Sequence, residues 1–101
     1  MHVHLETTDD VGRERVMQLL QYSLNGHRED IDSMQLSVAS IQDPLGTKLH
    51  RCRLRALLRH GPPIEVEEVQ SRLDLTVTRA LERCVRTIQR RRRASMQRHF
   101  A

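Results

Sequence analysis

Aromatic residues are almost absent from this chain, which has no Trp, one Tyr and one Phe among its 101 residues. The length allows one domain, and with 38% hydrophobic residues its core has to be aliphatic. Proteins that bind single-stranded RNA on a sheet usually stack the bases on aromatic side chains. The composition therefore disfavours base stacking and leaves backbone charge and shape as the means of binding RNA.

Cysteine is also scarce, since Cys52 and Cys84 are the only two. They are too few and too far apart for a disulfide framework or a zinc knuckle, so we expect buried free thiols. No apolar run approaches the roughly 20 residues that cross a bilayer. The N-terminus lacks the basic start and apolar stretch of a signal peptide. We therefore expect a cytoplasmic protein that does not enter a membrane.

Lysine is nearly missing, because sixteen of the seventeen basic residues are Arg. Residues 1–50 hold four basic residues against eight acidic ones, whereas residues 51–101 hold thirteen arginines against five acids. A guanidinium binds phosphate through two parallel hydrogen bonds and also stacks on bases. The arginine-rich second half therefore favours a nucleic-acid partner.

Hydrophobic periodicity divides the chain into six elements. Alternation predicts strands, and apolar residues at three- and four-residue spacing predict helices, in the order strand 2–6, helix 10–25, strand 34–41, strand 50–59, strand 64–69 and helix 73–93. Residues 7–10 are good capping residues for the first helix, and Asn25-Gly26 is a plausible stop. The order β-α-β-β-β-α predicts one α+β domain over residues 1–93, with two helices packed on one face of a four-stranded sheet, followed by a basic C-terminal tail over 94–101.

The loop at 42–48 carries strong turn residues and predicts a hairpin. Its register would place apolar residues opposite one another: Val38 with Cys52, Leu36 with Leu54, and Met34 with Ala56. A slip by one residue would turn arginines toward the core, so this register is strongly specified. On the other side of the third strand we expect Glu65 near Arg59 and Glu67 near Arg55.

Three arginines alternate along the outer face of the third strand. Arg51, Arg53 and Arg55 would stand about 6.5–7 Å apart, close to the spacing of successive phosphates in a nucleic-acid strand. Their expected neighbours on the second strand are uncharged, so nothing neutralises the arginines from that side. A solvated sheet face is the alternative interpretation.

A second row of arginines lies on the last helix, opposite its apolar stripe, and Arg90 to Arg93 extend the row. Like charges at this spacing repel one another unless an anion relieves them. Contact with several phosphates would give an affinity that falls steeply with salt. We expect nucleic-acid contact at ten residues: Arg51, Arg53, Arg55, Arg79, Arg83, Arg86, Arg90, Arg91, Arg92 and Arg93.

Motifs for catalysis or cofactors are missing from the sequence. The four glycines are scattered, no Ser/His/Asp or Cys/His arrangement has supporting spacing, and the histidines lie in no ligand pattern. We expect no enzyme activity, no metal or cofactor, and no small-molecule substrate.

The element order and two local patterns resemble the ribosome hibernation promoting factor and ribosome-associated inhibitor A family. One pattern is the Gly-containing turn before an acidic strand, from Gly61 to Glu68. The other is the helix start Leu73-Asp74, which leads to Leu81-Glu82-Arg83 and an arginine-rich end. The resemblance covers about nine-tenths of the chain and points to the short form, which has no dimerising extension.

This resemblance implies a translation inhibitor that binds rRNA in the decoding channel of the small ribosomal subunit and silences ribosomes under stress. The ten arginines would then be rRNA contacts. The oligomeric state stays open, with a monomer favoured. Two alternatives remain: a protein-interaction regulator, such as a transcription-factor modulator, and a double-stranded-RNA-binding module.

Overall fold

The computed structural model describes residues 1–7 and 10–100, and for residues 10, 11 and 97–100 it describes the backbone alone. The elements follow one another as β1 (His2–Thr7), α1 (Asp10–Ser23), a short 3-10 helix η1 (Arg28–Asp30), β2 (Ile31–Gln42), β3 (Lys48–Leu58), β4 (Ile64–Gln70) and α2 (Leu73–Phe100). The predicted element order is confirmed, with η1 as an addition.

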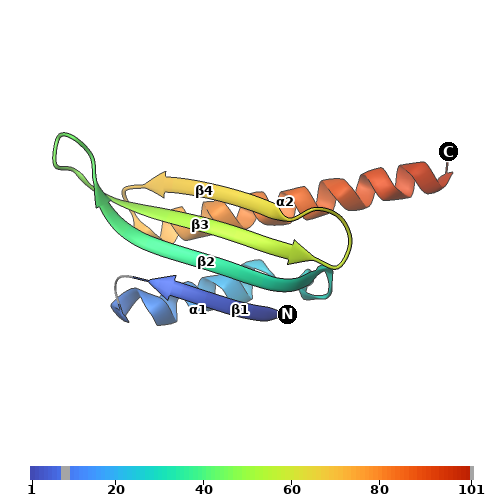
Figure 1. Ribbon diagram of the computed structural model, residues 1–101, viewed down its shortest axis with the longest axis horizontal. Coiled ribbons are helices and arrows are strands. Elements are labelled where there is room, and N and C mark those ends of the chain that lie inside the picture. Colours follow the sequence, from blue (N-terminus) through green and yellow to red (C-terminus); the bar gives the residue numbers. More distant parts are fainter. Residues whose placement is uncertain (8–9, 101) are drawn as a thin grey trace.

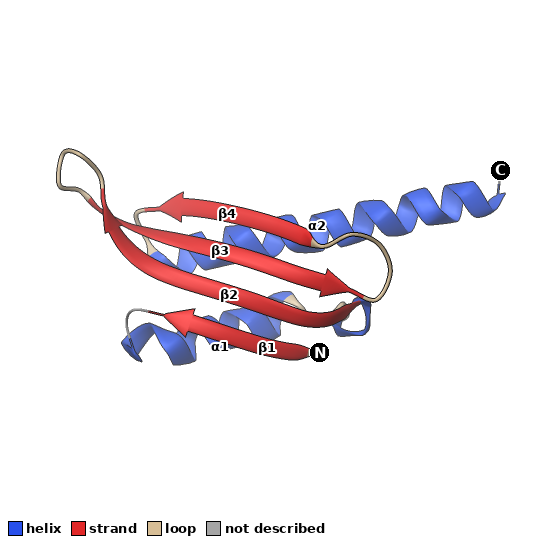
Figure 2. Cartoon of the chain, viewed as in Figure 1, coloured by secondary structure: helices blue, strands red, loops and turns tan. Residues whose placement is uncertain are grey.

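The four strands form one sheet in the order β1-β2-β3-β4 (Figure 1). β1 runs parallel to β2, and the other neighbours are antiparallel. Both helices lie on the same face of this sheet, as Figure 2 shows, and they pack against each other. The predicted α+β fold is confirmed. One sheet face is left open, and β1 and β4 are the edge strands.

The register of the β2–β3 hairpin is the predicted one, with Met34 opposite Ala56, Leu36 opposite Leu54 and Val38 opposite Cys52. All six side chains are buried. Because successive residues of a strand point to opposite faces, this register sends the arginines of β3 to the open face.

The predicted pairing of β4 is wrong. Glu65 lies opposite Arg55 and Glu67 opposite Arg53, while Arg59 forms an ion pair with Asp32 of β2. The predicted pairing would require a tight turn directly after Arg59. Pro62 and Pro63 have no N–H to donate to a strand ladder, so pairing begins only at Ala56 and Ile64 and the connection is longer.

The core is aliphatic, as the composition requires. The stripe of α2 contributes Val77, Ala80, Leu81, Cys84 and Ile88, all at most 3% exposed. From α1 come Val16 and Leu20, and Leu24 follows directly after this helix. These residues cover the inner face of the sheet and set which faces of α1 and α2 point to solvent.

Two helix ends differ from the prediction. α1 ends at Ser23, and the chain turns through Gly26, whose φ of +85° only glycine adopts readily. α2 continues past Arg93 to Phe100, so residues 94–100 of the expected tail are helical; the division of the chain at 93 stays a prediction. The capping residues proposed for α1 include Thr8 and Asp9, which lie outside the described residues.

Candidate nucleic-acid interface

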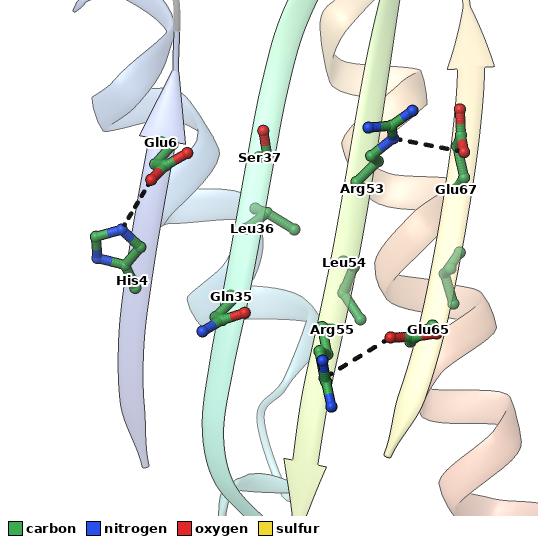
Figure 3. A pocket seen from close by; sticks show the side chains of 11 residues that line it. His4, Glu6, Gln35, Leu36, Ser37, Arg53, Leu54, Arg55, Glu65 and Glu67 are labelled. Atoms are coloured by element: carbon green, nitrogen blue, oxygen red, sulfur yellow. Dashed lines mark hydrogen bonds and ion pairs between the residues drawn. The ribbon is translucent and has the colours of Figure 1, made fainter.

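Strand β3 carries the first row of candidate arginines on the open face of the sheet. Arg53 and Arg55 are exposed there, and Arg51 is half-buried. Gln35 and Ser37 of β2 lie opposite Arg55 and Arg53, as expected (Figure 3). From the β2 side, therefore, nothing neutralises the row.

The β4 side of the row is acidic (Figure 3). Arg53 Nε lies 3.5 Å from Glu67 Oε2, and Arg55 Nε lies 3.7 Å from Glu65 Oε1. These distances exceed those of good hydrogen bonds, and all four side chains are at least half exposed. Each pair therefore stabilises the protein by at most about 1 kcal/mol. The carboxylates weaken this face as an anion site without closing it.

A shallow hollow of about 580 Å³ spans the same face, from β1 to β4. His4 and Glu6 line it on the β1 side, and the two arginine–glutamate pairs line it on the other. His4 Nε2 lies 3.2 Å from Glu6 Oε1. Acidic side chains line both rims of this hollow, so it carries charges of both signs and does not form a phosphate channel.

Helix α2 carries the second row, which runs beside the free edge of β4. Arg83, Arg86, Arg90 and Arg91 line one hollow of about 410 Å³ together with residues of β4, Ile64 among them. Arg86 and Arg90 are exposed and form no ion pair with any described carboxylate. The fold thus brings four of the predicted arginines together at this edge.

Two members of this group are bonded to β4 or to the loop that precedes it. Arg83 Nη1 donates to the backbone carbonyl of Glu67 at 3.0 Å and to Glu68 Oε1 at 3.1 Å, and Arg91 Nη1 donates to the carbonyl of Pro62 at 2.5 Å. Unpaired edge groups invite pairing with other chains. Arg83 therefore anchors α2 to β4 and satisfies an edge carbonyl, and Arg91 anchors α2 to the loop that precedes β4, in addition to any contact with RNA.

The far part of α2 points toward η1 instead. Arg92 Nη2 donates to Asp30 Oδ2 at 2.6 Å, and the Asp30 side chain is only 27% exposed. Arg93 is exposed and forms no ion pair with a described residue. A hollow of about 320 Å³ at this place also contains Arg59 and His60. Arg59 is not among the ten predicted residues, although it follows β3 directly and continues the alternation of arginines in the sequence.

The ten candidates therefore form three groups. Arg51, Arg53 and Arg55 lie on the open sheet face, Arg79 to Arg91 along the side of α2 next to β4, and Arg92 and Arg93 near its end. Because the helices cover the opposite face of the sheet from β3's arginines (Figure 2), the two main rows do not share one surface. The edge strand β4, with Glu65 and Glu67, separates them.

Solved structures with this architecture exist, although no protein-family model and no curated protein sequence matches the chain. The N-terminal domain of Protein Y from Thermus thermophilus superposes with a TM-score of 0.62 at 18% identity, covering 89% of this chain and 98% of that one. A ribosomal subunit interface protein from Coxiella burnetii gives a TM-score of 0.67 at 14% identity, covering 91% and 98%. This chain shares their fold.

The remaining chemistry of the molecule is sparse. Cys52 and Cys84 are free and buried, as predicted. Burial raises the pKa of Cys52 to about 12, helped by the nearby negative charge of Glu68, and burial raises the pKa of Cys84 to about 11. Both are therefore neutral thiols and poor nucleophiles at neutral pH.

Within the described residues, no group of His, Cys, Asp and Glu side chains could hold a metal ion. None of the helices described combines the length and apolarity that a membrane-crossing segment needs.

Proposed function

We propose that this protein is a non-catalytic translation inhibitor that binds rRNA of the small ribosomal subunit in its decoding channel. The observation that carries the proposal is the row of exposed arginines along α2, on a fold shared with a ribosomal subunit interface protein. Four of these arginines form no ion pair with any described carboxylate: Arg79, Arg86, Arg90 and Arg93.

The α2 row is the primary phosphate-binding surface in this proposal. Residues 79, 83, 86 and 90 recur at three- and four-residue intervals, so their guanidinium groups lie along one side of the helix. A rigid helix holds them at fixed spacing, which lowers the entropic cost of engaging several phosphates at once. Arg53 and Arg55 are secondary contacts, because each has to leave a glutamate to meet a phosphate.

Inhibition follows from occupancy. The Cα trace measures 53 × 26 × 19 Å, an elongated body that would fill a channel through which messenger and transfer RNA pass. No bond is made or broken, so the inhibition is reversible and is relieved when salt or a competing RNA displaces the protein. Storage of inactive ribosomes under stress is the corresponding physiological role.

Co-sedimentation with purified small subunits between 50 and 200 mM salt tests the proposal. Neutralising about four phosphates gives a log–log salt slope of about −3 to −4, so affinity should fall by roughly two orders of magnitude over this range. The triple substitution Arg79→Gln, Arg86→Gln, Arg90→Gln should flatten the slope to about −1. Arg28→Gln, an exposed arginine on η1, is the matched control and should leave the slope unchanged.

Two further measurements separate the alternatives. A double-stranded-RNA-binding module would bind free duplex RNA as tightly as small subunits, and a protein-interaction regulator would bind neither. Messenger RNA and initiator transfer RNA, added before the protein, should prevent its binding. If the wild-type protein fails to bind subunits at 50 mM salt, or binds equally at all salt concentrations, the proposal is wrong.

A further inference from the structure

The β2–β3 hairpin projects beyond the rest of the sheet (Figure 1). The last β1–β2 pair joins Thr7 to Val38, and the last β3–β4 pair joins His50 to Gln70, whereas β2 and β3 stay paired as far as Gln42 and Lys48. We call residues 39–51 the hairpin arm. It carries none of the acidic side chains found on the rest of the open face, apart from Asp43 in its loop.

Hydrogen bonds within the loop brace the tip of the hairpin arm. Asp43 Oδ1 accepts hydrogen bonds from the backbone N–H of Leu45 at 2.9 Å and of Thr47 at 2.8 Å. The backbone of Asp43 is bonded to Thr47 and Gly46 as well, and Gly46 has a φ of +82°. The Asp43 carboxylate is thus used for hydrogen bonds within the loop, and these bonds set the conformation of the loop in the free protein.

This tip presents Leu45, whose side chain is 92% exposed. A single exposed leucine is ordinary on a protein surface. Here, however, the leucine stands at the end of a braced projection, and a braced loop loses little entropy when it binds. A second apolar feature lies on the same arm.

The open face of the arm is aliphatic. Ile41 pairs with Leu49 there, and in the next row Arg51 lies between Ala39 of β2 and Val69 of β4. Val69 is 39% exposed, and the other aliphatic side chains are half-buried. The rest of this face carries the arginine–glutamate pairs, so the face is divided into a charged part and an aliphatic part.

Arg51 is the one cation within the aliphatic part, and its charge is uncompensated. Its cross-strand neighbours are uncharged, and it forms no ion pair with any described residue, unlike Arg53 and Arg55. A ligand that covers this strip therefore has to bring an anion as well as an apolar surface. Nucleobases stack on aromatic rings, and the open face of the arm has none, because His50 points to the opposite face from Arg51. An apolar strip whose one charged residue is Arg fits the centre of a protein–protein interface, where apolar area and Arg are enriched and Lys, Glu and Asp are depleted.

We propose that the hairpin arm docks on a ribosomal protein of the small subunit, with Leu45 in an apolar pocket and Arg51 paired with a carboxylate of that protein. This inference rests on the proposed function. Two surfaces of the molecule then bind different partners: α2 binds rRNA phosphates, and the hairpin arm positions the molecule against a ribosomal protein.

Leu45→Ala tests the proposal in two parallel titrations, one with intact small subunits and one with protein-free rRNA from the same subunits. Affinity for intact subunits should fall about tenfold, because truncating a central apolar anchor commonly has this effect, while affinity for rRNA should stay within twofold. Leu57→Ala, near the end of β3 that is farthest from the tip and 38% exposed, is the matched control and should change neither affinity.

A photoreactive phenylalanine analogue in place of Leu45 identifies what the tip touches in the purified complex. The expected adduct is with a ribosomal protein, and Arg51→Gln should reduce its yield. An adduct with rRNA, an adduct with a second copy of this chain, or no adduct would overturn the inference, as would equal loss of both affinities in Leu45→Ala. Those results leave subunit binding by the wild type intact. If the wild type does not bind subunits at all, the proposed function and this inference fail together.

Discussion

Arg83 and Arg86 stand on the same side of α2, less than one turn apart, yet the structure assigns them different tasks. Arg83 donates to the carbonyl of Glu67 and to the Glu68 carboxylate, whose side chain is only 16% exposed. Arg86 is exposed, and no described carboxylate pairs with it. Replacing each with Gln removes the same charge from nearly the same place. The two substitutions should therefore separate folding from binding.

The magnitudes follow from these contacts. Removing a hydrogen-bonding partner of a charged, partly buried group costs about 1–3 kcal/mol. Arg83 itself is 51% exposed, so solvent screening places the effect of Arg83→Gln near the lower end, about 1–2 kcal/mol. For a domain of this size that corresponds to a Tm about 5–10 °C lower. Arg86→Gln breaks no hydrogen bond or ion pair with a described residue and should stay within about 0.5 kcal/mol of the wild type.

Binding should show the opposite order, because Arg83 is already bonded to Glu67 and Glu68 and is therefore the less available of the two to phosphate. Arg86→Gln should reduce the salt slope of subunit binding by about 0.9, the contribution of one phosphate. Urea unfolding followed by circular dichroism measures the first effect, and co-sedimentation across a salt series measures the second. Glu68→Gln added to Arg83→Gln should recover part of the lost stability, because the carboxylate is then no longer left without its partner.

Equal stability of Arg83→Gln and Arg86→Gln would refute the anchoring role of Arg83. An unchanged salt slope in Arg86→Gln would refute the assignment of the α2 row to phosphate. Since the two results come from separate assays, one can fail while the other stands.

Three further outcomes are expected. Cys52 and Cys84 should resist alkylation by iodoacetamide at pH 8 in the folded protein and should react once urea unfolds it. Burial raises the pKa of both thiols above that of an unfolded thiol, so their contribution to stability should be full below about pH 9 and should decline as the pH rises toward 11 and 12. Urea titrations at several pH values would measure this decline. Glu67→Gln should release Arg53 and raise subunit affinity about two- to threefold, with a stability loss of at most about 1 kcal/mol; an unchanged or lower affinity would mean that the sheet face does not meet phosphate. Leu54→Ala, at a side chain 2% exposed in the centre of the sheet, should cost about 2–5 kcal/mol in urea unfolding, and a loss below 1 kcal/mol would contradict the described packing.

The local patterns of this chain predicted most of its fold correctly. Alternation and helical spacing depend only on which neighbours share a face, so Leu36 opposite Leu54 and the stripe of α2 follow from residue type and spacing alone. Shifting β2 against β3 by one residue would bury arginines, so the register had a single low-energy solution. The pairing of β4 carried no such penalty, because Glu65 and Glu67 stay on the outer face in either register. It depended on the geometry of the loop that precedes β4.

The sequence by itself determined the α+β layering, the aliphatic core, the two buried thiols and the concentration of arginine in the second half, since each follows from residue type and period. Only the tertiary structure decided where those arginines go. It placed one row on the open sheet face beside glutamates and the other along the β4 edge, and it bonded Arg83, Arg91 and Arg92 to groups 15 to 62 residues away. Such contacts depend on how the layers are packed and on which strand forms the edge. Period and composition do not contain that information, because it arises only when distant segments meet.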